Sequence, residues 1–322
     1  MNGFSKLYAS MFLTIALVTG ISALILYLIL NYLGMFSLWH LIIFITLIYI
    51  LQWIISPYVI DAMYKVRPAD PVNYSWLHQA VKDISMRSGI KTPRLMIADI
   101  SIPNAFAYGN MLTGYKVAVT RGLLSIMPKD EVVAVIGHEL GHIKHKDVAI
   151  MMIVGLLPAV ILWIGEYLVR WGWLFGFRRD RDSLSPLAVV GIGALFLLIG
   201  FLLNLGVLYL SRLREYYADA HSALSIPGGA KKLQRALARI MLATGWLSKR
   251  GINPGRYSQL KMLFIEAPEH TITSYTSDIN LVIEEIKSQK PSLLHEIFST
   301  HPHPAKRFRF LDKLYRESLP HM

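Results

Sequence analysis

The sequence contains no cysteine among its 322 residues. Disulfide bonds, thiolate metal ligands and a cysteine nucleophile are therefore excluded. Charged residues are also scarce, at 17%, whereas hydrophobic residues make up 54% and the mean hydropathy is +0.43. Because an average soluble domain has about 25% charged residues, this balance indicates segments embedded in a membrane.

Acidic residues are outnumbered, with 21 Asp and Glu against 33 Lys and Arg and a net charge of +12. The chain nevertheless lacks a basic run interleaved with aromatic residues, and no nucleic-acid-binding fold is recognisable. Basic residues that flank membrane segments are expected beside anionic lipid. We therefore expect a lipid bilayer, and no nucleic acid, as a partner.

Four apolar stretches account for the hydropathy, each close to the roughly 20 residues needed to cross a bilayer core. The first has a longer apolar run than a signal peptide, lacks a small-residue cleavage site and precedes a second span, so we interpret it as an uncleaved anchor. The sequence predicts four transmembrane helices, at residues 11–33, 36–55, 148–169 and 187–210.

A His-Glu-x-x-His motif stands in a polar stretch, at His138, Glu139 and His142. Apolar residues at helical spacing surround it, with Pro128 before the first turn, so the sequence predicts a helix over residues 128–147. Residues four apart share a helix face, which lets two imidazoles grip one zinc ion while the carboxylate addresses its bound water. The alternative interpretation is two histidines on a solvated helix face.

A small antiparallel sheet is predicted before this helix, from strands at residues 94–100, 104–108 and 115–120. If the strand with Asn104, Ala105 and Phe106 lies at an edge, it can pair with an extended substrate peptide. Pairing within the sheet is the alternative, because edge position cannot be read from sequence.

A catalytic zinc ion usually has three protein ligands, so another residue must join the two histidines. Glu215 is the best candidate because its helical segment starts where the fourth span ends. Asp219 lies one turn later on the same face and could orient a zinc-bound imidazole. The alternative is a helix whose acids pair with its own arginines.

Together these motifs resemble the HtpX family of membrane zinc metalloproteases, relatives of the CAAX prenyl proteases. The resemblance covers most of the chain and rests on residues 104–107, 138–142, 214–219 and 299–302. It implies His138, His142 and Glu215 as Zn2+ ligands, Glu139 as catalytic base and a role in membrane protein quality control. It also implies that His301 and Arg307 border the site, with His301 donating to the oxyanion and Arg307 holding its segment.

The expected fold is therefore an α-helical integral membrane protein with a mainly α (α+β) zincin-like catalytic domain and a small antiparallel sheet. Even numbers of crossings return the chain to one side, which predicts a catalytic domain split between two stretches of sequence. The expected divisions are a membrane hairpin at 1–56, a catalytic segment at 57–147, another hairpin at 148–210 and another catalytic segment at 211–322. Basic residues near the span ends favour a multi-pass protein of the cell (inner) membrane with its catalytic face in the cytoplasm.

Peptide hydrolysis is the predicted reaction, on peptides or membrane proteins. A zinc transporter would favour ionisable residues deep in several spans, where Asn204 alone is strongly polar. A non-catalytic scaffold would not require Glu139. Residues 250–291 match no family motif, and the basic face of the expected helix at 229–247 contacts either solvent or anionic headgroups. The sequence does not indicate an oligomeric state.

Overall fold

The structure is a computed structural model that describes residues 36–175, 185–249 and 278–318. The chain divides into two compact units, which are described separately. The apolar unit comprises the chain up to Gln52 together with Ala149–Ser211. The polar unit comprises Trp53–Val148 and the chain from Arg212 onward. Each unit is therefore assembled from two separate stretches of sequence.

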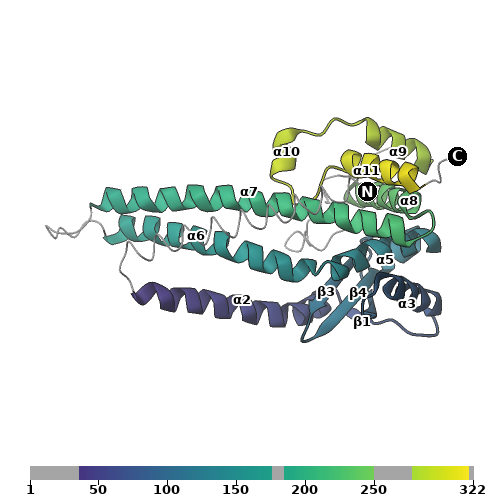
Figure 1. Cartoon of the computed structure of the whole chain (residues 1–322), viewed down its shortest axis with the longest axis horizontal. Coiled ribbons are helices and arrows are strands. Elements are labelled where there is room, and N and C mark those ends of the chain that lie inside the picture. Colours follow the sequence, from purple (N-terminus) through teal and green to yellow (C-terminus); the bar gives the residue numbers. More distant parts are fainter. Residues whose placement is uncertain (1–35, 176–184, 250–277, 319–322) are drawn as a thin grey trace. The chain divides into compact units, whose positions relative to one another are not determined.

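Within the described residues, three long helices carry the apolar sequence, at α2 (Phe36–Met63), α6 (Asp147–Phe175) and α7 (Pro186–Ser225) (Figure 1). Two of them contain candidate membrane spans within the described residues, Asp147–Arg170 and Pro186–Ser225. The expected first span, 11–33, lies outside the described residues, and that at 36–55 falls on α2. The structure thus supports two of the four expected spans, and the number four stays a prediction.

Glycines bring α6 and α7 together within the apolar unit. A Cβ on Gly165 would lie 2.9 Å from the backbone nitrogen of Leu197, and one on Gly193 would lie 2.8 Å from that of Val169. Neither glycine can gain a side chain without moving a backbone. The two helices therefore pack at a separation that only small residues permit.

The polar unit is built on a four-stranded sheet in the order β1-β2-β4-β3. Its strands are β1 (Val66–Pro68), β2 (Arg94–Ala98), β3 (Ala105–Asn110) and β4 (Gly114–Thr120). The expectation of an antiparallel sheet was wrong, because β2 and β4 pair in parallel while the other two pairings are antiparallel. Strand β3 lies between β2 and β4 along the chain but is placed outside them, at the end of the sheet.

Both faces of this sheet are covered, which explains why its strands are apolar nearly throughout. Leu95 and Val117 point to one face, into a core with α3 (Ser75–Ser88) and α5 (Lys129–Lys144). Phe106 and Ala118 point to the other face, where the end of α2 packs through Tyr64. Alternation along each strand therefore divides the apolar residues between two cores.

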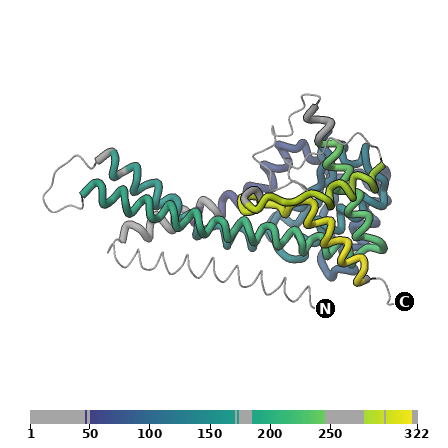
Figure 2. The backbone as a smooth tube through the Cα atoms, turned by 90° about the horizontal axis from the view of Figure 1, so that it is seen from above, coloured from purple at the N-terminus to yellow at the C-terminus, as the bar shows by residue number. Residues whose placement is uncertain are grey.

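The other helices in the part of the chain that the structure describes are α4 (Arg121–Ile126), α8 (Gly229–Lys249), α9 (Ile279–Ser288), α10 (Leu293–Ile297) and α11 (Pro304–Ser318). Helix α11, the yellow C-terminal helix in Figure 2, packs against α8 and α9, and α8 packs against α5. The C-terminal helices thereby close the core around the helix that carries the His-Glu-x-x-His motif.

The basic face of α8 is engaged by acidic residues of the protein itself. Arg235 and Arg239 donate to the two oxygens of the buried Glu131 at 3.0 and 2.8 Å. Lys231 contacts Asp312 at 2.6 Å. These contacts tie α8 to α5 and α11, and they account for its basic residues without a lipid headgroup.

Candidate metal centre

Helix α5 carries the His-Glu-x-x-His motif and begins close to the expected position. Asp130 and Glu131 lie in its first turn, where carboxylates interact favourably with the partial positive charge of the helix N-terminus. His138 is fully buried and Glu139 nearly so. The interpretation of the motif as a solvated helix face is therefore wrong.

Two glycines allow α7 to approach this motif closely. A Cβ on Gly141 would lie 3.0 Å from the Cα of Ala218, and one on Gly137 would lie 2.5 Å from the Cδ1 of Ile226. At Gly141 the neighbour is the backbone of α7, so a side chain there would push the two helices apart, whereas near Gly137 the tip of the Ile226 side chain can move aside. The close approach brings the carboxylates of α7 to the imidazoles of α5.

Three side chains, His138, His142 and Glu215, form the one candidate metal cluster found among the described residues. The Nε2 atoms of the two histidines are 3.2 Å apart. Oxygens of Glu215 lie 3.6 Å from Nε2 of His138 and 3.7 Å from Nε2 of His142. The imidazole edges and one carboxylate thus converge on a common point.

These separations fit a tetrahedral zinc site. Ligand atoms about 2.0–2.1 Å from a tetrahedral zinc ion lie about 3.3 Å apart, which is close to the distances observed between the ligand atoms here. The buried Oε2 of Glu215 accepts no hydrogen bond from the described residues, as expected for an atom reserved for a metal. Two neutral imidazoles and a carboxylate are also ligands that suit zinc.

A buried carboxylate and arginine support His138 from behind. The Nδ1 of His138 faces Oδ1 of Asp219 at 3.0 Å. Arg307 donates to both oxygens of Asp219, at 2.9 and 2.7 Å, and its Nη1 lies 3.6 Å from Glu215. Burial alone would lower the pKa of His138, but Asp219 and Glu215 raise it to about 10 in the metal-free protein.

His142 has an equivalent support that was not predicted from the sequence. Its Nδ1 lies 2.5 Å from Oδ2 of Asp147, and Arg214 contacts the same oxygen at 2.9 Å. A left-handed turn at Lys146, with φ of +55°, separates the end of α5 from the start of α6 at Asp147. This turn brings Asp147 back toward His142, five residues earlier.

Glu139, on α5, lies beside β3, the strand at the end of the sheet. Its Oε2 accepts a hydrogen bond of 2.8 Å from the backbone nitrogen of Ala107 in β3. Burial raises the pKa of Glu139, while the neighbouring His142 and His138 lower it by a smaller amount. A carboxylate with a raised pKa is better suited to take a proton near neutral pH.

The side chains of Asn104, Ala105 and Phe106 are all buried, so they offer no side-chain contact to a peptide. The carbonyl of Asn104 accepts from the nitrogen of Thr120 at the start of the β3–β4 pairing. Backbone direction alternates along an antiparallel strand, so alternate residues of β3 point their backbone groups away from β4. Because β3 ends the sheet, the expected edge is present.

His301 is brought to the same cluster from the C-terminal region of the chain. It is buried, and its Nε2 lies 3.8 Å from Oε1 of Glu215. Arg212 holds the preceding segment by donating to the carbonyls of Ile297 and Ser299, at 3.2 and 2.7 Å. Arg307 lies on α11, the helix that follows His301, and ties that helix to Asp219.

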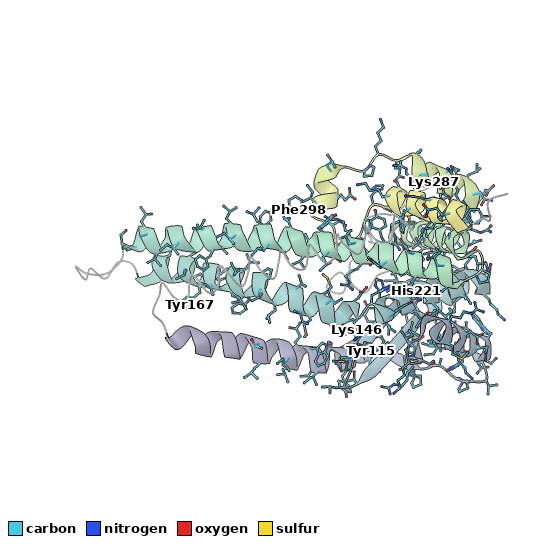
Figure 3. All side chains as sticks on the ribbon, in the orientation of Figure 1. Tyr115, Lys146, Tyr167, His221, Lys287 and Phe298 are labelled. Atoms are coloured by element: carbon cyan, nitrogen blue, oxygen red, sulfur yellow. The ribbon has the colours of Figure 1, made fainter. Side chains whose placement is uncertain are left out.

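His221, labelled in Figure 3, is a core residue of the α5–α7 packing. Its Nδ1 donates to the carbonyl of Gly137 at 2.7 Å, which leaves Nε2 to accept from Ser88 at 2.8 Å. Both ring nitrogens are thus satisfied by structural bonds. No chemistry was expected of His221 from its place in the sequence, and the geometry gives no reason to add any.

The fold and the cluster define a membrane metallopeptidase: apolar helices, a His-Glu-x-x-His helix, a candidate third ligand from a later helix and an edge strand beside the glutamate. Residues 71–315 match the family model "Peptidase family M48", which covers more than half of the chain. The chain belongs to peptidase family M48.

Curated relatives agree with this assignment. A "Protease HtpX homolog" of Aeropyrum pernix is 43% identical over 267 residues, 82% of each chain. Another from Thermoplasma volcanium is 37% identical over 305 residues, 94% of this chain and 92% of that protein. The resemblance to the HtpX family is therefore confirmed.

A solved structure, the "Crystal Structure of S. mikatae Ste24p", has a similar fold. The superposition has a TM-score of 0.53 at 20% identity and covers 96% of this chain and 67% of that one. At this identity the likeness concerns the fold alone.

Proposed function

We propose that the protein is a zinc endopeptidase that cleaves membrane or misfolded proteins and serves membrane protein quality control. The observation that supports this proposal most directly is the metal-binding geometry. The ligand atoms of His138, His142 and Glu215 are separated by distances that fit tetrahedral zinc, and the buried carboxylate of Glu139 lies beside them. The names of the curated relatives support the same activity. They give no support to a zinc transporter or an inactive scaffold.

Zinc, when bound, would supply Lewis acidity to the scissile carbonyl and to water. Glu139 takes the proton of the attacking water and delivers it to the leaving amine. The hydrogen bond from Ala107 fixes one oxygen of Glu139, so the carboxylate is oriented before substrate arrives. Asp219 and Asp147 hold the two imidazoles through their Nδ1 atoms and leave both Nε2 atoms for the metal.

His301 donates a hydrogen bond to the oxyanion that forms at the scissile carbonyl. Its burial and its distance of 3.8 Å from Glu215 support this role, because the ring reaches the cluster without belonging to the metal-binding set. Arg212 and Arg307 fix the elements on either side of it. Such preorganised donors stabilise charge that develops in the transition state.

Substrate binds as an added strand along β3. The outward backbone groups of this edge strand that Glu139 does not engage offer donors and acceptors to an extended peptide. The bond between Ala107 and Glu139 then places the scissile bond next to the catalytic carboxylate. Asn104, Ala105 and Phe106 support the strand through their buried side chains rather than through side-chain contact with substrate.

The membrane is the cell membrane, and the polar unit faces the cytoplasm. Basic residues near the span ends, such as Lys65, Arg67 and Lys144, support this orientation by the positive-inside rule. Accessibility of tags inserted in the exposed turn at Val72 and at the C-terminus, probed from the cytoplasmic side, tests it. Protection of either tag from the cytoplasmic probe would contradict it.

Two variants separate the metal site from the base. In Glu139→Gln the amide keeps the shape but not the basicity, so zinc content should stay at the wild-type value while peptide cleavage falls about 10²–10⁴-fold. In Glu215→Ala a metal ligand is lost, so zinc content should fall with activity. Zinc loss in the first variant, or full activity in the second, would overturn the assignment.

A third variant tests His301. His301→Ala should keep zinc and lower turnover about 10²–10³-fold, the usual effect of removing one oxyanion donor. Cleavage at the wild-type rate would exclude His301 from the mechanism.

A further inference from the structure

The turn between β3 and β4 exposes apolar side chains where turns are usually polar. Met111 and Leu112 are 72% and 71% exposed. Gly, Asn, Asp, Ser and Pro dominate turns because they suit the backbone and interact with water. Two adjacent large apolar side chains at a turn tip therefore indicate contact with something apolar.

Part of the backbone of this turn is hydrogen-bonded to side chains of the protein. The side-chain oxygen of Asn110 accepts from the backbone nitrogens of Leu112 and Thr113, at 3.0 and 2.9 Å. Arg94 donates to the carbonyl of Thr113 at 2.7 Å. A turn that enters a lipid interface needs this property, because unpaired backbone groups are costly there.

The turn is bonded to the C-terminal part of α2, the helix that begins in the apolar unit. The side-chain amide nitrogen of Asn110 donates to the carbonyl of Trp53 at 2.9 Å. Beyond Trp53 an exposed apolar stripe runs through Ile55, Val59 and Met63, at the spacing of one helix face. The turn is therefore anchored to a part of α2 that itself exposes an apolar surface.

We propose that the β3–β4 turn inserts Met111 and Leu112 into the headgroup–acyl boundary of the bilayer. Their apolar area, the hydrogen bonds within the turn and the attachment to α2 favour lipid over water. The contact would hold β3 at the membrane surface. A protein segment that leaves the bilayer would then reach the edge strand beside Glu139 after a short stretch of extended chain.

The absence of cysteine makes a direct test simple, since one introduced cysteine carries the only label. The full-length variants Leu112→Cys and Met111→Cys are spin-labelled and reconstituted into vesicles of phosphatidylcholine and phosphatidylglycerol. Val72→Cys is the control, because Val72 is 82% exposed in a separate loop. Accessibility to oxygen, which concentrates in lipid, is compared with accessibility to a water-soluble nickel chelate.

Insertion predicts that labels at both turn positions favour oxygen and lie about 5–10 Å below the lipid phosphates, the depth of interfacial apolar faces. The Val72 label should favour the nickel chelate. Equal nickel accessibility at residues 112 and 72 would overturn the proposal by showing a turn in water. Shielding from both reagents would also overturn it, because it would indicate contact with protein. Neither result depends on peptidase activity.

Discussion

The two imidazoles of the candidate metal centre are supported in the same way from different regions of the chain. Asp219 and Arg307 support His138, and all three side chains are inaccessible to solvent. Asp147 and Arg214 support His142, where the imidazole and the arginine are 15% and 10% exposed. The same arrangement of a carboxylate between a histidine and an arginine thus occurs twice. It is fully buried around His138 and partly exposed to solvent around His142.

The comparison distinguishes two roles of a carboxylate that contacts both a histidine and an arginine. We call these two sets of side chains the His138 arm (His138, Asp219 and Arg307) and the His142 arm (His142, Asp147 and Arg214). In both arms the carboxylate orients an imidazole so that its Nε2 faces the candidate metal position. In the His138 arm it also neutralises a fully buried guanidinium, which would otherwise be left in the core. We therefore expect the arms to contribute similarly to metal binding and unequally to stability.

The largest effect is expected from Asp219→Asn. The change leaves the buried charge of Arg307 without its bidentate carboxylate, and breaking a buried ion pair costs about 3–5 kcal/mol. Zinc affinity should also fall, by about 10–100-fold. Thermal unfolding followed by circular dichroism measures the stability loss, and zinc titration measures the affinity. Wild-type stability of the metal-free variant would refute the dual role.

Asp147→Asn is the matched change in the other arm. Zinc affinity should fall by a similar factor of about 10–100, because the neutral amide that faces Nδ1 of His142 is a weaker acceptor than the carboxylate and is free to turn its NH2 group toward the ring. The stability loss should be smaller, about 1–3 kcal/mol, since Arg214 retains some contact with water. If zinc titration gave the wild-type affinity, Asp147 would have no part in positioning His142.

The pH dependence of zinc binding should report the His138 arm. Asp219 and Glu215 raise the pKa of His138 to about 10 against the effect of burial, so the metal-free imidazole is protonated near neutral pH. Zinc must displace that proton, and its apparent affinity should weaken about tenfold for each unit that pH falls between 8 and 6. Competition titrations with a chelator of known affinity measure this slope. A pH-independent affinity would show that His138 is neutral before zinc arrives.

One arm could be predicted from the sequence and the other could not, for a physical reason. Asp219 follows Glu215 by four residues on a helix, so their shared face could be predicted from spacing alone. Asp147 follows His142 by five residues, which in a continuous helix would place it on another face. Its approach depends on the left-handed turn at Lys146, a conformation for which lysine gives no signal.

The order of the strands in the sheet also could not be predicted from the sequence. Apolar runs between turn residues located β2, β3 and β4, but their order depends on pairings between distant segments. The parallel pairing of β2 with β4 places β3 outside, and no local pattern encodes that choice. Which strand ends the sheet, and hence where a peptide could add, therefore came from the structure.

The smallest expected effect concerns the turn that creates the His142 arm. Lys146 has φ of +55°, a conformation that costs a residue with a side chain about 1–2 kcal/mol and that glycine adopts freely. Lys146→Gly should therefore leave zinc affinity unchanged and stabilise the protein by up to about 1 kcal/mol, because glycine also gains freedom in the unfolded chain. Lys144→Gly is the control, since Lys144 lies in the last turn of α5, where a glycine costs about 0.5–1 kcal/mol. Unfolding midpoints that shift in opposite directions would show that the strain lies at residue 146. Equal destabilisation by both changes would mean that the turn is held by the lysine side chain, and the geometry of the His142 arm would then depend on it.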